Sequence, residues 1–206
     1  MRKIKVFFHS IVLFKNWWLF VLTRLRWRKE PFTLKFRNGV QLYIPAPVKC
    51  VMASYEIFGD EIYTKHCKNP KRVVDIGCGI GDFAIYCAMK GATVYGFDMD
   101  AIRIAAAEKN ISLNKFTGSV RIEQKEVKLL PDIPCDLLKL DCEGGEYDII
   151  LNSPDASFEK IANIAMERHG PPEPLVKRLR DLKYRVLEDE SIYIYATRNA
   201  VDDPRF

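Results

Sequence analysis

The sequence predicts a doubly wound α/β fold with a mostly parallel, seven-stranded sheet, an antiparallel last strand, and an N-terminal extension of helices and a hairpin. Two observations predict this fold. From residue 71 onward, short apolar or β-branched runs alternate with longer helical patterns, as in repeated βα units. Near the C-terminus, strand-like segments at 184–187 and 191–197 leave no room for a helix between them, so they must pair antiparallel.

Length and composition agree with this fold. The 206 residues allow one sizeable domain with a short appendage, and 48% of them are apolar or aromatic. No apolar run approaches the 18 or so residues needed to span a bilayer. The six cysteines include no Cys-x-x-Cys pair, which predicts reduced, mostly buried thiols in a cytoplasmic protein and no zinc site.

We expect residues 1–70 to form an N-terminal arm and cap, and residues 71–206 to form the main domain. Residues 1–37 hold ten Lys or Arg against one acid, a net charge of +9, although the whole chain carries only +5. The basic character therefore belongs to the arm. Alternating residues around Asn38-Gly39 predict a β-hairpin, and a helix with a turn at Gly59 follows it.

The arm mixes aromatic and basic side chains within residues 1–29, and more than one interpretation stays open. Trp17, Trp18 and Trp27 lie among arginines in one or two predicted amphipathic helices. Such helices suit an anionic membrane surface, here the inner face of the membrane, with the protein bound peripherally. Alternatively, the aromatic side chains pack on the domain and only the charges face water. Nucleic-acid binding is a third and weaker interpretation.

The elements of the main domain follow in βα order. Gly91 marks the end of the first helix, and Asp98 or Asp100 can cap the second. The run LLKLD is almost wholly apolar, as expected of a strand buried on both faces. The predicted strands are 72–76, 93–98, 119–125, 136–141, 161–167, 184–187 and 191–197, and the predicted helices are 82–90, 100–114 and 175–182.

The stretch VVDIGCGIGDF, residues 73–83, predicts the binding of an adenosine-bearing cofactor. A dinucleotide loop would have its third glycine where this chain has Asp82, and carboxylates at Asp82 and Asp75 would repel a pyrophosphate. A carboxylate instead favours the ammonium group of S-adenosylmethionine. The cofactor contacts predicted in this loop are Asp75, Gly77, Cys78, Gly79 and Gly81.

The next strand supplies a second cofactor contact. It ends in VYGFDMD, where Asp98 can accept hydrogen bonds from both ribose hydroxyls. Asp98 lies 17 residues after Gly81, the distance expected for successive βα units. We predict that Asp98 and its neighbour Met99 bind the cofactor, together with Asp141 at the end of the fourth strand.

Charged residues gather at the ends of the fourth and fifth strands. The carboxyl ends of neighbouring parallel strands meet at one edge of the sheet, where doubly wound folds bind their ligands. A network of lysine and carboxylates that only stiffens the turn would also explain some of these charges. The charged residues are Lys139, Asp141, Glu143 and Glu146 in LLKLDCEGGEYDII, with Glu167 and His169 in AMERHG.

These motifs resemble the FkbM family of methyltransferases from about Lys35 to Ala196. The most specific part is the pattern K-x-D-x-E-G-x-E, which begins at Lys139. The resemblance implies a class I, Rossmann-like methyltransferase fold and O-methylation of a hydroxyl on a sugar, glycolipid or polyketide-derived product. The basic, Trp-rich arm resembles that of small prokaryotic members. Cys78-Gly79 stands where the family has Ala-Asn, and Asp98-Met99 where it has Glu-Pro. Both changes approach the general methyltransferase pattern, and the acceptor stays open.

A hydroxyl acceptor must lose its proton, which assigns roles to the charged residues. Asp141 and His169 are the predicted bases, and Lys139 would stabilise the developing alkoxide or hold Asp141 in place. Glu143 completes the predicted catalytic set. A divalent cation on Asp141 is conceivable, but the sequence offers no dedicated cage of oxygen ligands, so no metal ligand is predicted.

Three other functions compete with this prediction. A nucleic-acid methyltransferase could use the basic arm, although the acidic strand ends oppose a polyanion. A non-catalytic module could keep the cofactor fold at a membrane surface. An NAD-dependent oxidoreductase is the most distant alternative. The expected partner is a small molecule, a glycan or a lipid-linked sugar that accepts the methyl group.

Overall fold

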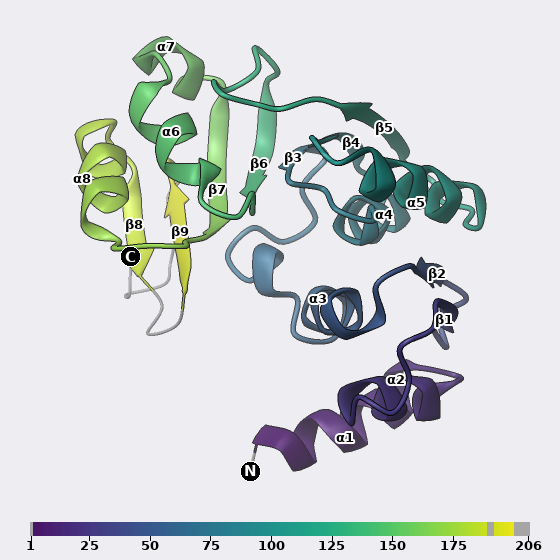
Figure 1. Ribbon diagram of the computed structural model, residues 1–206. Coiled ribbons are helices and arrows are strands. Elements are labelled where there is room, and N and C mark those ends of the chain that lie inside the picture. The colour runs from purple at the N-terminus through teal and green to yellow at the C-terminus, as the bar shows by residue number, and fades with distance from the viewer. Residues whose placement is uncertain (1, 189–191, 200–206) are drawn as a thin grey trace.

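The computed structural model describes residues 2–188 and 192–199, and it is built around one seven-stranded sheet (Figure 1). The five strands β3 to β7 run parallel, whereas β9 is antiparallel to both of its neighbours. This arrangement confirms the predicted fold class. The strands are β3 (Arg72–Ile76), β4 (Thr93–Asp98), β5 (Ser119–Gln124), β6 (Cys135–Leu140), β7 (Ile161–Glu167), β8 (Arg185–Glu188) and β9 (Tyr193–Thr197).

Helices cover both faces of this sheet. Alternate residues of β3 and β6 face opposite layers: Val74 and Leu138 join one apolar cluster, and Val73 and Leu137 join another. The first cluster includes side chains of α6 and α8, and the second includes side chains of α4. The helices of the main domain are α4 (Asp82–Met89), α5 (Ala101–Ser112), α6 (Gly145–Asn152), α7 (Asp155–Phe158) and α8 (Glu173–Asp181).

Several boundaries differ from the sequence-based expectation. The predicted strand at 136–141 is β6 and ends at Leu140, so Asp141 opens the following loop. The strand predicted from residue 191 begins at Tyr193, and residue 191 lies outside the described residues. Helices α6 and α7 were not predicted. For α6 the reason is the Gly144-Gly145 pair, which indicated a turn; Gly144 does adopt a φ of +111°, but a helix starts directly after it.

The strand order, β5-β4-β3-β6-β7-β9-β8, places a switch point at the centre of the sheet. The chain runs outward from β3 to β5 and then returns to lay β6 on the other side of β3. The carboxyl ends of β3 and β6 are therefore neighbours, and the N–H of Asp141 donates to the carbonyl of Ile76 at 3.1 Å. Ligands of doubly wound folds bind at such a point.

The N-terminal region forms the predicted helices, hairpin and cap. Its elements lie below the sheet in Figure 1. The hairpin pairs β1 and β2 in antiparallel register. The cap helix begins at Pro47 and ends at Gly59, where the turn was expected. The elements are α1 (Arg2–Leu13), α2 (Trp17–Arg24), β1 (Phe32–Lys35), β2 (Gln41–Ile44), α3 (Pro47–Gly59) and a 3-10 turn, η1 (Ile62–Thr64).

The aromatic side chains of the arm divide between the core and the surface. Phe14 and Phe20 are buried in one apolar cluster with Ile85 of α4. Trp18 and Trp27 are 50% and 77% exposed. The packing interpretation therefore holds for Phe14 and Phe20, whereas the side chains of Trp18 and Trp27 lie at the surface. Among the described residues, none of the helices is long and apolar enough to cross a membrane.

Candidate functional site

The glycine loop between β3 and α4 is pressed against two other parts of the domain. Gly77 has a φ of +76°, and a Cβ atom there would lie 1.8 Å from the carbonyl oxygen of Asp141. Gly81 also has a φ of +76°, and its Cβ position lies 3.1 Å from the Cβ of Ala107 in α5. Both positions require glycine, because a side chain would push the end of β6 or α5 away.

Gly79 lies on the open side of the same loop. Apart from Gly79 and its two chain neighbours, no heavy atom of the described residues lies within 4 Å of a Cβ atom placed there. The N–H of Gly79 donates to Asp98 Oδ2 at 2.9 Å, and the N–H of Asp100 donates to Asp98 Oδ1 at 2.9 Å. The Asp98 carboxylate therefore connects the end of β4 to the glycine loop. The space beside the Cα of Gly79 stays open.

A cleft of about 970 Å³ opens beside this loop. Its wall includes Gly77, Asp98, Met99 and Arg103, and it continues to Glu143 beyond the end of β6. Met99 is largely exposed, so an apolar surface lies next to an acidic one. A cleft of this size, with apolar walls and a few fixed polar groups, suits a small-molecule ligand.

Two of the predicted cofactor contacts lie beneath the loop instead of facing the cleft. The side chain of Cys78 is buried, and its Sγ lies 3.3 Å from the Cβ position of Gly96 in β4. Burial raises the pKa of this thiol. Asp75 is fully buried as well. The backbone of this segment remains beside the cleft, but these two side chains are turned into the core.

Asp75 and Lys139 form an ion pair inside the sheet, where β3 and β6 place them side by side. Lys139 Nζ lies 3.0 Å from Asp75 Oδ1 and donates to the carbonyl of Gly77 at 2.6 Å. Burial alone would lower the pKa of Lys139, but the charges of Asp75 and Asp141 raise it. The expected direct contact of Asp75 with a cofactor ammonium, or of Lys139 with an acceptor alkoxide, does not fit this burial. The other predicted role of Lys139, to hold Asp141 in place, does fit, because Asp141 Oδ2 lies 3.9 Å from Nζ.

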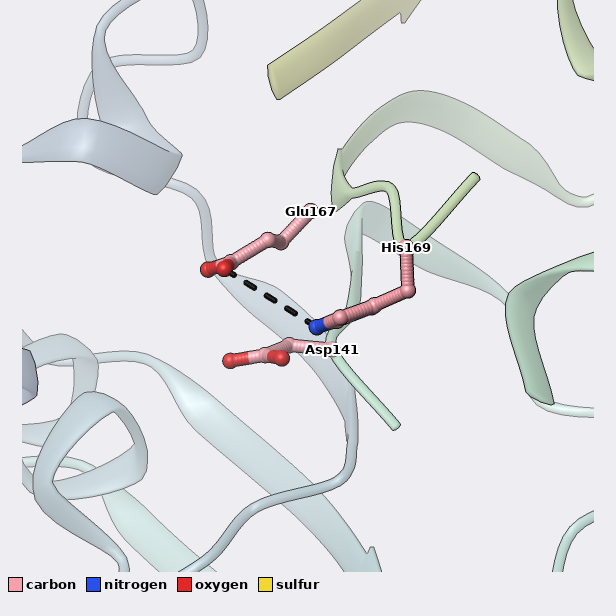
Figure 2. Close-up of side chains that lie close together, drawn as sticks. All are labelled: Asp141, Glu167 and His169. Atoms are coloured by element: carbon pink, nitrogen blue, oxygen red, sulfur yellow. Dashed lines mark ion pairs between the residues drawn. The ribbon is translucent and has the colours of Figure 1, made fainter. Parts of the chain in front are cut away.

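Asp141, Glu167 and His169 meet at the carboxyl edge of the sheet (Figure 2). Asp141 follows β6, Glu167 ends β7, and His169 lies two residues further along. One polar atom from each side chain lies within 4.8 Å of the other two. The Nε2 atom of His169 lies 3.9 Å from Glu167 Oε1. We call these three residues the rim cluster.

Tyr63 of η1 covers the two carboxylates of the rim cluster. Its hydroxyl lies 3.0 Å from Asp141 Oδ2 and 3.4 Å from Glu167 Oε2, and it can donate to either oxygen. Burial and the charges of these two carboxylates raise the pKa of Tyr63, so the hydroxyl keeps its proton. Burial and the charge of Asp141 also raise the pKa of Glu167.

Glu146 supports His169 from the other side. This fully buried carboxylate accepts hydrogen bonds from the N–H groups of Cys142 at 2.6 Å and Gly144 at 2.9 Å. Its Oε1 also lies 3.3 Å from His169 Nδ1. Glu143 has a φ of +55° and a largely exposed side chain, and its Oε2 lies 3.8 Å from His169 Nε2. The strand ends thus hold His169 between carboxylates.

Sequence reasoning missed Tyr63 and did not select Glu146 or Glu167 as site residues. Tyr63 lies 78 residues before Asp141 in a short turn without a motif, so nothing in the sequence pointed to it. Glu146 is the last acid of the K-x-D-x-E-G-x-E pattern, and Glu167 is a charge at a strand end. The motif position of Glu146 and the strand-end position of Glu167 could therefore have identified both as site residues.

The strand order with a reversed β9, the glycine loop and the acid at the end of β4 define a class I, Rossmann-like methyltransferase fold. Residues 57–160, about half of the chain, match the family described as methyltransferase domain. The chain belongs to this family.

Individual relatives are more distant. The ribosomal protein L11 methyltransferase of Bacillus pumilus is 26% identical over 151 residues, which are 73% of this chain and 36% of that protein. The tRNA (guanine(37)-N(1))-methyltransferase of Theileria parva is 29% identical over 107 residues, covering 46% of this chain and 23% of that protein. The matched part of this chain thus spans about a third or less of these relatives.

Solved structures share the fold at low sequence identity. The magnesium protoporphyrin IX methyltransferase from Synechocystis PCC 6803, solved with bound SAM, has a TM-score of 0.55 at 17% identity, covering 74% of this chain and 83% of that one. The tRNA m1G37 methyltransferase of M. jannaschii has a TM-score of 0.54 at 20% identity, covering 82% of this chain and 56% of that one. These likenesses confirm the fold.

Proposed function

We propose that this chain is a methyltransferase that uses S-adenosylmethionine to methylate a hydroxyl group of a sugar, a glycolipid or a related metabolite. The observation that carries the proposal is the position of the rim cluster, beside the glycine loop at the switch point of the sheet. A hydroxyl acceptor has to lose a proton, and we propose that a carboxylate or imidazole group of the rim cluster takes it.

S-adenosylmethionine is the cofactor that the comparisons support, because structures of this fold hold it or its demethylated product. The chain's own residues fit it. Asp98 lines the cleft and has acceptor capacity left for ribose hydroxyls, and Met99 offers an apolar surface to a base. Gly79 leaves open the space that a side chain would fill. The chemistry supplied by the bound cofactor is methyl transfer from a sulfonium to a nucleophile.

The remaining roles follow from the rim contacts. Asp141 and His169 are proposed to remove the acceptor proton, since both are partly exposed at the strand ends. Lys139 is a positioning residue, because its buried charge lies 3.9 Å from Asp141 and favours the ionised carboxylate. Glu143, whose Oε2 lies 3.8 Å from His169 Nε2, would stabilise the imidazolium that forms when Nε2 takes the proton. The finer resemblance to the FkbM family, through K-x-D-x-E-G-x-E, favours an oxygen acceptor.

A nucleic-acid acceptor is the second candidate, and the names of several relatives favour it. Two tRNA methyltransferases stand among the proteins similar to this chain. The acidic groups at the strand ends count against it, because carboxylates at Asp141, Glu143 and Glu167 would repel a phosphate backbone near the transferred methyl group. Salt-sensitive binding of tRNA by the purified protein would favour this candidate.

Peripheral membrane contact through the arm is a further part of the proposal. Trp18 and Trp27 are exposed on a segment rich in arginine, a combination that suits an anionic lipid surface. The buried Phe14 and Phe20 are not available for lipid, so the contact would involve only the exposed side chains of residues 1–29. A lipid-linked sugar at the inner membrane face would then be within reach.

Calorimetry and turnover assays test the proposal together. The purified chain is expected to bind S-adenosylmethionine more tightly than NAD. Asp141→Asn and His169→Ala should lower turnover on hydroxyl acceptors far more than they weaken cofactor binding. Tighter binding of NAD would overturn the cofactor assignment. Cofactor binding without methylation of any glycan, glycolipid or tRNA would favour the non-catalytic module.

A further inference from the structure

We infer that Asp141, Glu167 and His169 form a binding site for one divalent first-row transition-metal ion such as Mn²⁺ or Zn²⁺. Figure 2 shows the three side chains converging from the ends of β6 and β7. The catalytic part of this inference deepens the proposed function and rests on it, whereas ion binding itself does not.

The geometry is close to that of a metal site. The three candidate ligand atoms lie within 4.8 Å of one another. Ligand atoms at about 2.1 Å from an ion lie at most about 4.2 Å apart, so small side-chain rotations would close the site. The side chains of Asp141, Glu167 and His169 are 31%, 22% and 27% exposed, which leaves them room to rotate and leaves an ion a route of entry.

The donor set selects the class of ion. Mg²⁺ and Ca²⁺ prefer sites made of oxygen ligands only, whereas an imidazole nitrogen beside carboxylates suits Mn²⁺, Fe²⁺ or Zn²⁺. Three protein ligands are also the number found in catalytic zinc sites, which keep a position open for water or substrate. The rim cluster supplies two carboxylates and one imidazole.

Neighbouring groups prepare His169 to bind through Nε2. The buried Glu146 carboxylate lies 3.3 Å from Nδ1, and this contact favours a proton on Nδ1. The lone pair of a neutral imidazole is then on Nε2, the atom that faces Glu167 at 3.9 Å. A carboxylate behind a histidine is the usual support of metal-bound imidazole.

The charge around the rim cluster favours a cation. Asp141 and Glu167 are joined by the carboxylates of Glu143 and Glu146 around one imidazole. The nearby ammonium of Lys139 is closer to Asp75, at 3.0 Å, than to Asp141, at 3.9 Å. Tyr63 contacts both rim carboxylates and Tyr193 hydrogen-bonds Glu167, but these phenol groups are neutral and do not balance the negative charge.

An ion in this position changes the roles of the rim residues. Asp141 and His169 would be ligands instead of proton acceptors, and the ion would take the acceptor hydroxyl oxygen as a further ligand. The proton of that hydroxyl would pass to the exposed Glu143 carboxylate, 3.8 Å from His169 Nε2. A bound metal ion lowers the pKa of such an oxygen group. The acceptor would then be recognised through the oxygen that it presents to the ion.

Metal titration of the full chain, after removal of ions with a chelator, tests the inference. Loss of the free Mn²⁺ electron paramagnetic resonance signal should saturate at one ion per chain, and Zn²⁺ should displace the Mn²⁺. We expect His169→Ala and Glu167→Gln each to weaken binding at least tenfold. Glu146→Gln should weaken it about 10–100-fold through the orientation of His169. The matched control is Glu173→Gln, an exposed carboxylate on α8 that should leave binding unchanged.

Two results would overturn the inference: no saturable binding of either ion by the wild-type chain, or wild-type affinity in a folded His169→Ala variant. Circular dichroism establishes that each variant is folded. Calorimetry with S-adenosylmethionine in the presence of chelator separates the two proposals. Cofactor binding without metal binding would reject only the metal site, and metal binding without cofactor binding would reject only the proposed methyltransferase cofactor.

Discussion

Two charged clusters lie side by side at the centre of this protein and differ in their surroundings. The Lys139–Asp75 pair is buried, with 4% and 0% of the two side chains exposed, and its charges balance. The rim cluster begins 3.9 Å away at Asp141, is partly exposed and carries an excess of acids. Two residues of one motif therefore have different surroundings, because Lys139 pairs with Asp75 inside the sheet and Asp141 lies at the partly exposed strand end.

The largest effect is expected from breaking the buried pair. Lys139→Met leaves the fully buried Asp75 carboxyl without its cation inside the sheet, which should cost about 3–5 kcal/mol of unfolding free energy. Urea denaturation measures this loss. The double variant Asp75→Leu/Lys139→Met should recover much of it, since two apolar side chains replace the pair.

A surface ion pair provides the control for that experiment. Lys68 lies 3.3 Å from Glu61 with 66% of its side chain exposed. Lys68→Met should change the unfolding free energy by less than about 1 kcal/mol, because solvent screens exposed pairs. An equally small effect of Lys139→Met would show that the buried pair contributes no more than a surface pair.

The contrast between the buried pair and the rim cluster also separates what the sequence predicted from what it did not. The sheet, its reversed strand and the position of Asp98 were predictable because βα periodicity and glycine spacing are local signals. The convergence of Asp141 and His169 was predictable because the carboxyl ends of adjacent parallel strands meet.

Burial was the property that the sequence did not reveal. Asp75 and Lys139 look like site residues in the motif, but β3 and β6 pair them inside the sheet. Tyr63 reaches the rim cluster from a distant turn, so only the packing of η1 against β7 brings it there. Helix α6 was not predicted because it begins at a glycine. The buried side chains of Ile149 and Ile150 lie on the face of the helix that packs on the core.

Asp82 is a second buried carboxylate, and burial raises its pKa as it raises that of Asp75. Asp82 of α4 accepts from the Ser54 hydroxyl at 2.8 Å, and burial raises its pKa to about 6. A folded-state pKa above the ordinary value of 3.8 means that stability is present at low pH and is lost as pH rises through about 6.

Asp82→Asn removes this titration. Relative to the wild type, the variant should gain about 2–3 kcal/mol of unfolding free energy between pH 4 and pH 7, since one pKa unit corresponds to about 1.4 kcal/mol. Urea denaturation at several pH values gives the difference. A difference that stays constant over this range would contradict the raised pKa.

Asp98 extends the comparison to a carboxylate that faces the cleft and is held by backbone N–H groups. Asp98→Ala should weaken S-adenosylmethionine binding by about 1–3 kcal/mol through lost charged hydrogen bonds. Isothermal titration calorimetry measures this change, and circular dichroism checks that the loop remains folded. Unchanged affinity would show that Asp98 serves only to hold Gly79 and Asp100.

The smallest change in stability is expected at the exposed aromatic side chains of the arm. Trp18→Ser/Trp27→Ser should alter the unfolding free energy by about 0.5 kcal/mol, because both side chains are largely exposed. The same variant should lose sedimentation with anionic vesicles, and high salt should weaken wild-type binding because it screens exposed charges. The buried control, Phe14→Ser, should instead destabilise the fold. Full vesicle binding by the double variant would assign Trp18 and Trp27 no role at a membrane surface.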